Sequence, residues 1–153
     1  MRGEPVMPRN SIDYEKDFYA WTVEQSRMLR SGEISSIDAE NIAEELESMG
    51  RSDRRELKNR LVILVMHLLK WRHQPAARSR SWSATIDEQR LQIEDILAES
   101  PSLRPMMAAM LSAAYEIARG RAIAETGLAD EAFPEECPFT PDEVLSRQFL
   151  PEH

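Results

Sequence analysis

Residues 57–71 decide the fold of this chain, and they read Leu57-Lys58-Asn59-Arg60-Leu61-Val62-Ile63-Leu64-Val65-Met66-His67-Leu68-Leu69-Lys70-Trp71. Leucines recur within it at spacings of four and three residues, which is one face of a helix. Further apolar side chains surround that face, and a helix that is apolar on all sides is normally packed by neighbours on all sides. We therefore expect a central helix from about Ser52 to Arg72.

The same part of the chain carries its only excess of positive charge. Residues 51–90 hold ten Lys and Arg against four Asp and Glu, whereas the whole chain has a net charge of −8. The balance is −6 over residues 1–50 and −8 over residues 91–153. The charge order indicates either salt bridges within the protein or a surface that binds anions. An acidic chain as a whole is not broadly attracted to nucleic acid or to anionic lipid.

Composition excludes several classes of protein. The single cysteine, Cys137, rules out a disulfide within the chain and a cysteine-rich zinc site, and we interpret it as an inert packing or surface group. Residues 1–6 lack the apolar core of a signal peptide. No apolar stretch reaches the roughly 20 residues that cross a bilayer, so no membrane association and a cytoplasmic location are expected.

Capping signals divide the rest of the chain into helices, and no alternating strand pattern is present. Ser, Thr and Asp side chains accept hydrogen bonds from the free N–H groups of a first helical turn, while glycine ends helices. Gly120 lies inside one expected helix, where it indicates a close helix contact or a bend. Five other helices are expected. The first starts at Ser11 or Asp13 and ends at Ser31-Gly32, and the second runs from Ser36 to Gly50. The others start near Ser81 or Ser83, run from Ser100-Pro101 to Gly127, and run from Thr140 to near Phe149.

These elements predict an all-α fold. One domain of this length buries a substantial core. We expect a single-domain helical bundle of about five main helices plus a short C-terminal helix. Residues 1–11 should form a flexible lead-in, and residues 12–150 the helical domain.

His67 is the first candidate for chemistry. On a buried helix its imidazole needs a partner, and two interpretations are open. In one it is a metal ligand or general base in a pocket with Glu44 or Glu45 and an arginine such as Arg90. In the other it is a core histidine that hydrogen-bonds to a neighbouring group, and this second interpretation is favoured because buried polar groups normally find partners. No HExxH motif is present, and no metal site is predicted.

The basic segment 51–90 is the second candidate. Clustered arginines bind phosphates by charge and by bidentate hydrogen bonds. The helix spreads these cations around its circumference, however, and acidic neighbours flank the segment, so a surface of salt bridges is favoured over nucleic-acid or phosphate binding. The candidate anion-binding residues are Arg51, Arg54, Arg55, Arg78 and Arg80.

Several short strings occur in an order that resembles one protein family. They are Asp17-Phe18-Tyr19-Ala20-Trp21, Asn41-Ile42-Ala43-Glu44-Glu45-Leu46-Glu47, His67-Leu68-Leu69-Lys70-Trp71, Gln74-Pro75, Arg78-Ser79-Arg80-Ser81-Trp82, Gln89-Arg90 and Ser100-Pro101-Ser102-Leu103. From about Ile12 to Leu150 the chain closely resembles the bacterial family of domain of unknown function 29. The resemblance implies an all-helical fold and implies no activity, catalytic residue or cofactor.

Three functions are consistent with these observations. The leading hypothesis is a non-enzymatic interaction or regulatory protein whose partner is a protein, either a second copy or another chain. Its basis is the lack of catalytic motifs and a helical architecture rich in methionine, whose flexible side chain suits adaptable contacts. The alternatives are an enzyme or ligand-binding protein with the His67, Glu44, Glu45 and Arg90 pocket, and nucleic-acid or phosphate binding through residues 51–90. The residues identify neither a reaction nor a cofactor.

Overall fold

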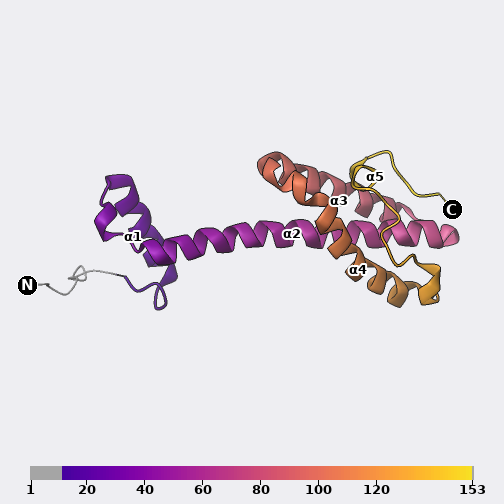
Figure 1. Ribbon diagram of the computed structural model, residues 1–153, viewed down its shortest axis with the longest axis horizontal. Coiled ribbons are helices and arrows are strands. Elements are labelled where there is room, and N and C mark those ends of the chain that lie inside the picture. The colour runs from indigo at the N-terminus through magenta and orange to yellow at the C-terminus, as the bar shows by residue number, and fades with distance from the viewer. Residues whose placement is uncertain (1–11, 153) are drawn as a thin grey trace, which may run out of the picture. The chain divides into compact units, whose positions relative to one another are not determined.

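The computed structural model describes residues 12–152, and all regular structure in this range is helical (Figure 1). The prediction of an all-α protein is confirmed. The flexible lead-in predicted for residues 1–11 lies outside the described residues. The α-helices are α1 (Phe18–Ser31), α2 (Ala39–His73), α3 (Arg80–Glu99), α4 (Met107–Thr126) and α5 (Pro141–Leu145), and the short 3₁₀ helices are η1 (Ile34–Ser36), η2 (Pro75–Ala77), η3 (Pro101–Met106) and η4 (Asp130–Ala132).

The chain divides into two compact units, and the boundary lies within α2. The N-terminal unit ends at Arg51 and contains α1, η1 and the first part of α2, while the C-terminal unit begins at Ser52 and contains the remaining elements. One helical domain over residues 12–150 stays a prediction.

The C-terminal unit holds the hydrophobic core. Its part of α2 lies alongside α3 and α4 (Figure 1), and α5 packs against both α3 and α4. The leucines at 57, 61, 64, 68 and 69 are fully buried, as the pattern that opened the sequence analysis predicts. Aromatic side chains from the segment after α4, Phe133 and Phe139, complete the core.

Helix α2 continues through Gly50, where the sequence predicts that one helix stops or kinks and that another begins near Ser52. It runs unbroken for 35 residues. Glycine in a helix interior costs roughly 1 kcal/mol relative to alanine, which is too little to end a helix flanked by good helix formers. Arg51 also pairs across this point with Glu44 at 3.0 Å and with Glu47 at 3.9 Å.

The start of α1 also differs from the prediction. The helix begins at Phe18 and is capped by Asp17, whose side chain accepts from the N–H of Ala20, so Asp13 does not cap it. Asp13 instead closes a turn, because its side chain accepts from the N–H of Glu15 at 2.8 Å and its carbonyl accepts from Asp17 at 3.0 Å. The other proposed cap, Ser11, lies outside the described residues.

The start of the fifth predicted helix is a 3₁₀ segment. Ser100 makes no capping hydrogen bond through its side chain, and η3 precedes α4. Pro105 has no N–H to donate to the carbonyl of Pro101, so the α-helical pattern begins only at Met107.

The remaining boundaries lie near the predicted ones, and α2 begins at Ala39 rather than at Ser36, which belongs to η1. Gly32 and Gly127 end α1 and α4 in the left-handed conformation, with φ of 80° and 69°. Ser79 caps α3, two residues before Ser81 and four before Ser83, the two predicted starts. Thr140 and Glu143 form the predicted capping box, but α5 ends at Leu145 rather than near Phe149. Gly120 is exposed and no atom lies within 4 Å of a Cβ built on it, so the expected close helix contact is absent there.

Candidate functional site

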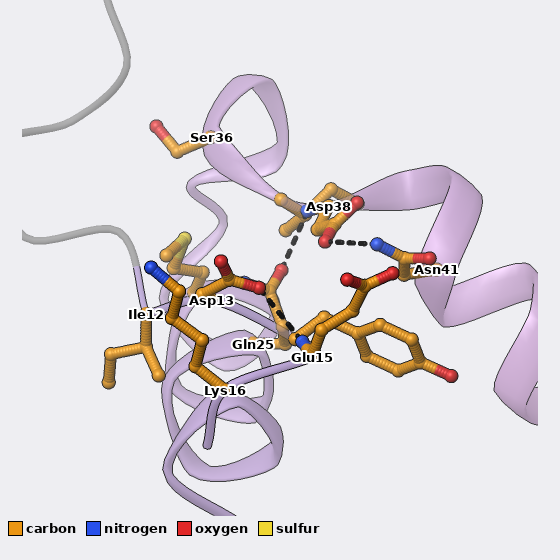
Figure 2. A pocket seen from close by; sticks show the side chains of 11 residues that line it. Ile12, Asp13, Glu15, Lys16, Gln25, Ser36, Asp38 and Asn41 are labelled. Atoms are coloured by element: carbon orange, nitrogen blue, oxygen red, sulfur yellow. Dashed lines mark hydrogen bonds between the residues drawn. The ribbon is translucent and has the colours of Figure 1, made fainter. Parts of the chain in front are cut away.

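Asp38 joins the elements of the N-terminal unit (Figure 2). Its Oδ2 accepts from the indole N–H of Trp21 at 3.1 Å and from the side-chain amide of Asn41 at 2.8 Å. Its backbone N–H donates to Oε1 of Gln25 at 2.7 Å. Gln25 and Trp21 lie on the buried face of α1, so this network ties α1 to the beginning of α2.

A cavity of about 900 Å³ opens beside this network (Figure 2). Ile12 and Met28 contribute apolar surface to its wall. The charged side chains in its lining are three carboxylates and one ammonium group, so the cavity is acidic. They belong to Asp13, Glu15, Asp38 and Lys16.

Glu44 and Glu45 lie in the N-terminal unit, and each has a partner there. Glu44 pairs with Arg51 at 3.0 Å, which is the expected salt bridge to the arginines that follow. Glu45 accepts a hydrogen bond from the hydroxyl of Tyr14. That hydrogen bond, together with burial and the negative charge of Glu45, raises the pKa of Tyr14 above 10.0, because all three favour the neutral phenol.

Much of the hydrophobic side-chain surface in the described part of the N-terminal unit is exposed. Among residues 12–152, the buried hydrophobic side chains of this unit are Trp21 and Met28, and the C-terminal unit has 22. Large hydrophobic side chains that are exposed in this unit lie on α1, on η1 and on the first part of α2. They are Phe18, Tyr19, Val23, Leu29, Ile34, Leu46 and Met49.

His67 lies half-buried on α2 in the C-terminal unit. Its Nδ1 lies 2.8 Å from the carbonyl oxygen of Ile63, one turn earlier in the same helix. A carbonyl oxygen only accepts hydrogen bonds, so Nδ1 carries the hydrogen. Because Glu44 and Glu45 belong to the other unit, the pocket predicted from these residues stays a prediction.

Arg90, the fourth residue of that predicted pocket, is buried with 2% of its surface exposed. Its Nε donates to the carbonyl of Val144 at 2.8 Å and its Nη2 to the carbonyl of Glu143 at 3.4 Å. These carbonyls belong to the last turn of α5, where a cation interacts favourably with the helix dipole. Burial lowers the pKa of Arg90 from its ordinary value.

The five predicted anion-binding arginines have different surroundings. Arg51 pairs with two glutamates in the N-terminal unit. Arg78 turns inward, since its Nε donates to the carbonyl of Trp71 at 2.7 Å and its guanidinium lies 5.1 Å from the Trp71 ring. Arg54, Arg55 and Arg80 are exposed. Anion binding by this set stays a prediction, which salt-sensitive retention of DNA or RNA would test.

The residues of the N-terminal cavity, and the two arginines that line a pocket with Arg90, were not predicted as site residues from the sequence. Gln25 gave one available signal, because it is a polar residue on an otherwise apolar helical face. Asp38 gave another, since it directly precedes α2. Arg104 and Arg147, which line a second pocket together with Arg90, carried no local signal.

Among residues 12–152, no three His, Cys, Asp or Glu side chains are grouped so that they could hold a metal ion. No helix within this range combines the length and the apolar character that a membrane span requires.

Comparison with known proteins places the chain in a family. Residues 14–150 match the model of the family described as Domain of unknown function DUF29. The chain belongs to this family. This match confirms the family resemblance that the order of short sequence motifs indicated. All regular structure in the described residues of this family member is helical. No curated protein and no solved structure matches the chain.

Proposed function

We propose that this DUF29 protein is a non-enzymatic interaction module whose N-terminal unit binds a basic, amphipathic segment of another protein. The observation that carries the proposal is the apolar surface of that unit, where among residues 12–51 seven large hydrophobic side chains are exposed and two hydrophobic side chains are buried. Exposed apolar side chains that share a surface, as Leu46 and Met49 do on one helix face, normally mark a place where another molecule binds.

Charge indicates the chemistry of the partner. Residues 1–50 have a net charge of −6, and carboxylates outnumber ammonium groups in the lining of the cavity in the same unit. A partner that buried apolar side chains here would gain from lysine or arginine beside them, because complementary charge steers association and disfavours other partners. A second copy that presented the same acidic face would be repelled. The proposed occupant is therefore a different, basic chain.

Leu46 and Met49 are the best probes of this surface. They lie three residues apart on α2, so they share one face of the helix, and 63% and 64% of their surface is exposed. Serine at these positions removes apolar contact area from a partner while it removes no buried contact from the folded chain. Leu91, which is 46% exposed in the C-terminal unit, offers a matched control.

Binding of a fluorescent peptide tests the proposal. The probe is a designed amphipathic helix of leucine and lysine, titrated with the full chain and followed by fluorescence anisotropy. A second peptide, with serine in place of leucine, measures binding by charge alone. We expect the leucine peptide to bind, and the double variant Leu46→Ser, Met49→Ser to bind it about tenfold more weakly, because central apolar anchors dominate such interfaces. Leu91→Ser should bind as the unaltered chain does.

Three results would overturn the proposal. The first is equal binding of the two peptides, and the second is equal binding by the double variant and by Leu91→Ser. The third is a dimer in light scattering that the double variant converts to a monomer, since the occupant would then be a second copy. Detection of catalytic turnover would contradict the non-enzymatic part of the proposal.

A further inference from the structure

A second pocket lies in the C-terminal unit and gathers positive charge. It has a volume of about 290 Å³ and is lined by side chains from α3, from η3 and from the end of α5 onward. Three of the six lining residues are arginines and one is a glutamate. The lining residues are Arg90, Glu94, Leu97, Arg104, Leu145 and Arg147.

Arg90 is the unusual member of this lining. Its guanidinium is buried, and its hydrogen bonds go to two backbone carbonyls, while the negative charge of Asp87 acts on it without forming an ion pair. The third nitrogen, Nη1, is buried without a hydrogen-bond partner. Buried cations are normally paired, and a buried donor without an acceptor destabilises the folded chain. A small shift of the Arg90 guanidinium toward the pocket would let an anion there supply an acceptor for Nη1.

Glu94 does not supply that acceptor. It lies one turn after Arg90 on α3, but its carboxylate pairs with Arg147 at 2.7 Å. With this pair neutral, Arg90 and Arg104 are the two lining cations that form no ion pair with a carboxylate among the described residues. Two such cations suit the charge of a phosphate group near neutral pH.

We propose that this pocket, the arginine pocket, binds a phosphate group. Arginine recognises phosphate with two parallel hydrogen bonds, which gives both affinity and orientation. The volume corresponds to about ten water molecules at ~30 Å³ each, so a small phosphate monoester fits as well as inorganic phosphate. Because Arg90 also binds the last turn of α5, an occupied pocket holds α3, η3 and the C-terminal segment together.

Calorimetric titration of the full chain with inorganic phosphate and with glycerol phosphate, at constant ionic strength, tests the proposal. Saturable binding of either compound is expected, and the tighter of the two identifies the form of phosphate that the pocket prefers. Arg104 is exposed, so Arg104→Gln preserves the fold, and we expect it to weaken binding about tenfold. Arg121→Gln, an exposed arginine of α4 outside the pocket, should have no effect.

Glu94→Gln provides a test of opposite sign. It removes the pocket's only carboxylate and frees Arg147, so phosphate should bind several-fold more tightly. No saturable binding, or equal affinity in Arg104→Gln, Glu94→Gln and Arg121→Gln, would overturn the proposal. The arginine pocket and the peptide-binding surface lie in different units and are probed by different ligands. Failure of either proposal is therefore distinguishable from failure of the other.

Discussion

Asp38 is the residue on which the N-terminal unit depends most. It accepts from Trp21 and donates to Gln25, so it provides two hydrogen bonds that join α1 to the start of α2, and it also accepts from Asn41 on α2. The sequence predicts only that Asp38 lies in the first turn of a helix that starts at Ser36, whereas in the structure it directly precedes α2, a common capping position. Its contacts with α1 arise because the turn after α1 brings the chain back on itself.

Asp38→Ala should destabilise the N-terminal unit by about 1–3 kcal/mol, because it leaves the buried indole N–H of Trp21 without an acceptor. Urea denaturation followed through the NMR signal of the Trp21 indole N–H measures this loss. Glu40→Ala, an exposed neighbour in the first turn of α2, is the control and should change the stability little. Equal effects of the two substitutions would show that the Asp38 contacts contribute nothing.

His73 predicts how stability depends on pH. Its ring lies 4.6 Å from that of Phe133, and its Nε2 is buried without a partner. Burial, and secondarily the charge of Arg72, lower the pKa of His73 below 6.5. The folded chain thus takes up a proton less readily than the unfolded chain does. The stability that the neutral ring contributes is present above the unfolded value of 6.5 and is lost as the pH falls below it.

The free energy of unfolding should therefore decrease between about pH 7 and about pH 5, and His73→Gln should reduce that decrease. Urea denaturation of both chains across this range measures the difference. An NMR titration of the His73 ring gives its pKa in the folded chain independently. A midpoint above 6.5 would contradict the prediction.

Helix α2 shows the limit of local signals at the scale of an element. Gly50 is a signal that ends a helix, and Ser52 and Asp53 are signals that start one, so the sequence predicts that the helix stops or kinks at Gly50. The helix continues because a weak local preference is outweighed by the helix formers on both sides and by the ion pairs of Arg51. Gly127 shows the opposite case, since its backbone has φ of 69° and the helix ends there.

Replacement of these two glycines by alanine should change stability in opposite directions. Gly50→Ala adds a methyl group that meets no atom within 4 Å in a helical backbone, so it should stabilise the chain by about 0.5–1 kcal/mol. Gly127→Ala places a Cβ on a left-handed residue and should destabilise the chain by about 1 kcal/mol. Urea denaturation followed by far-ultraviolet circular dichroism measures both. A shift of the same sign for the two variants would contradict this account of α2 and α4.

At the scale of the whole molecule, the two units differ in how much apolar surface they bury. Of the buried hydrophobic side chains in the part of the chain that the structure describes, two lie in the N-terminal unit and 22 in the C-terminal unit. Burial of apolar surface is the dominant favourable contribution to folding. The N-terminal unit is therefore the less stable of the two, which suits a surface that completes its packing when a partner binds.

Native-state hydrogen exchange should show this difference directly. Amides in α1 should exchange faster than those in α3 and α4, because α1 opens at a lower free-energy cost than the core helices do. Mass spectrometry of proteolytic fragments after exchange measures the rates unit by unit. Equal protection of α1 and α4 would show that the N-terminal unit is stabilised by contacts other than its own buried side chains.

The sequence by itself determined the all-α class, the central apolar helix, the capping box of α5 and the glycines that end α1 and α4. All of these depend on interactions within a few residues, which spacing and composition reveal. Family membership followed in the same way from the order of short strings. The helix boundaries predicted near Gly50 and Pro105 differ from those of the structure, because several weak local preferences compete at these positions.

Only the tertiary structure decided which side chains form sites. Arg90 meets carbonyls 53 and 54 residues away, and Asp38 meets side chains of α1 that precede it by 13 and 17 residues. No local pattern encodes such partners, because they depend on how the helices and turns fold against one another. The candidate pocket of His67, Glu44, Glu45 and Arg90 was assembled from residue types alone, and its members lie in two units. The acidic cavity, the exposed apolar surface and the arginine pocket became visible only when burial and hydrogen-bond partners were known.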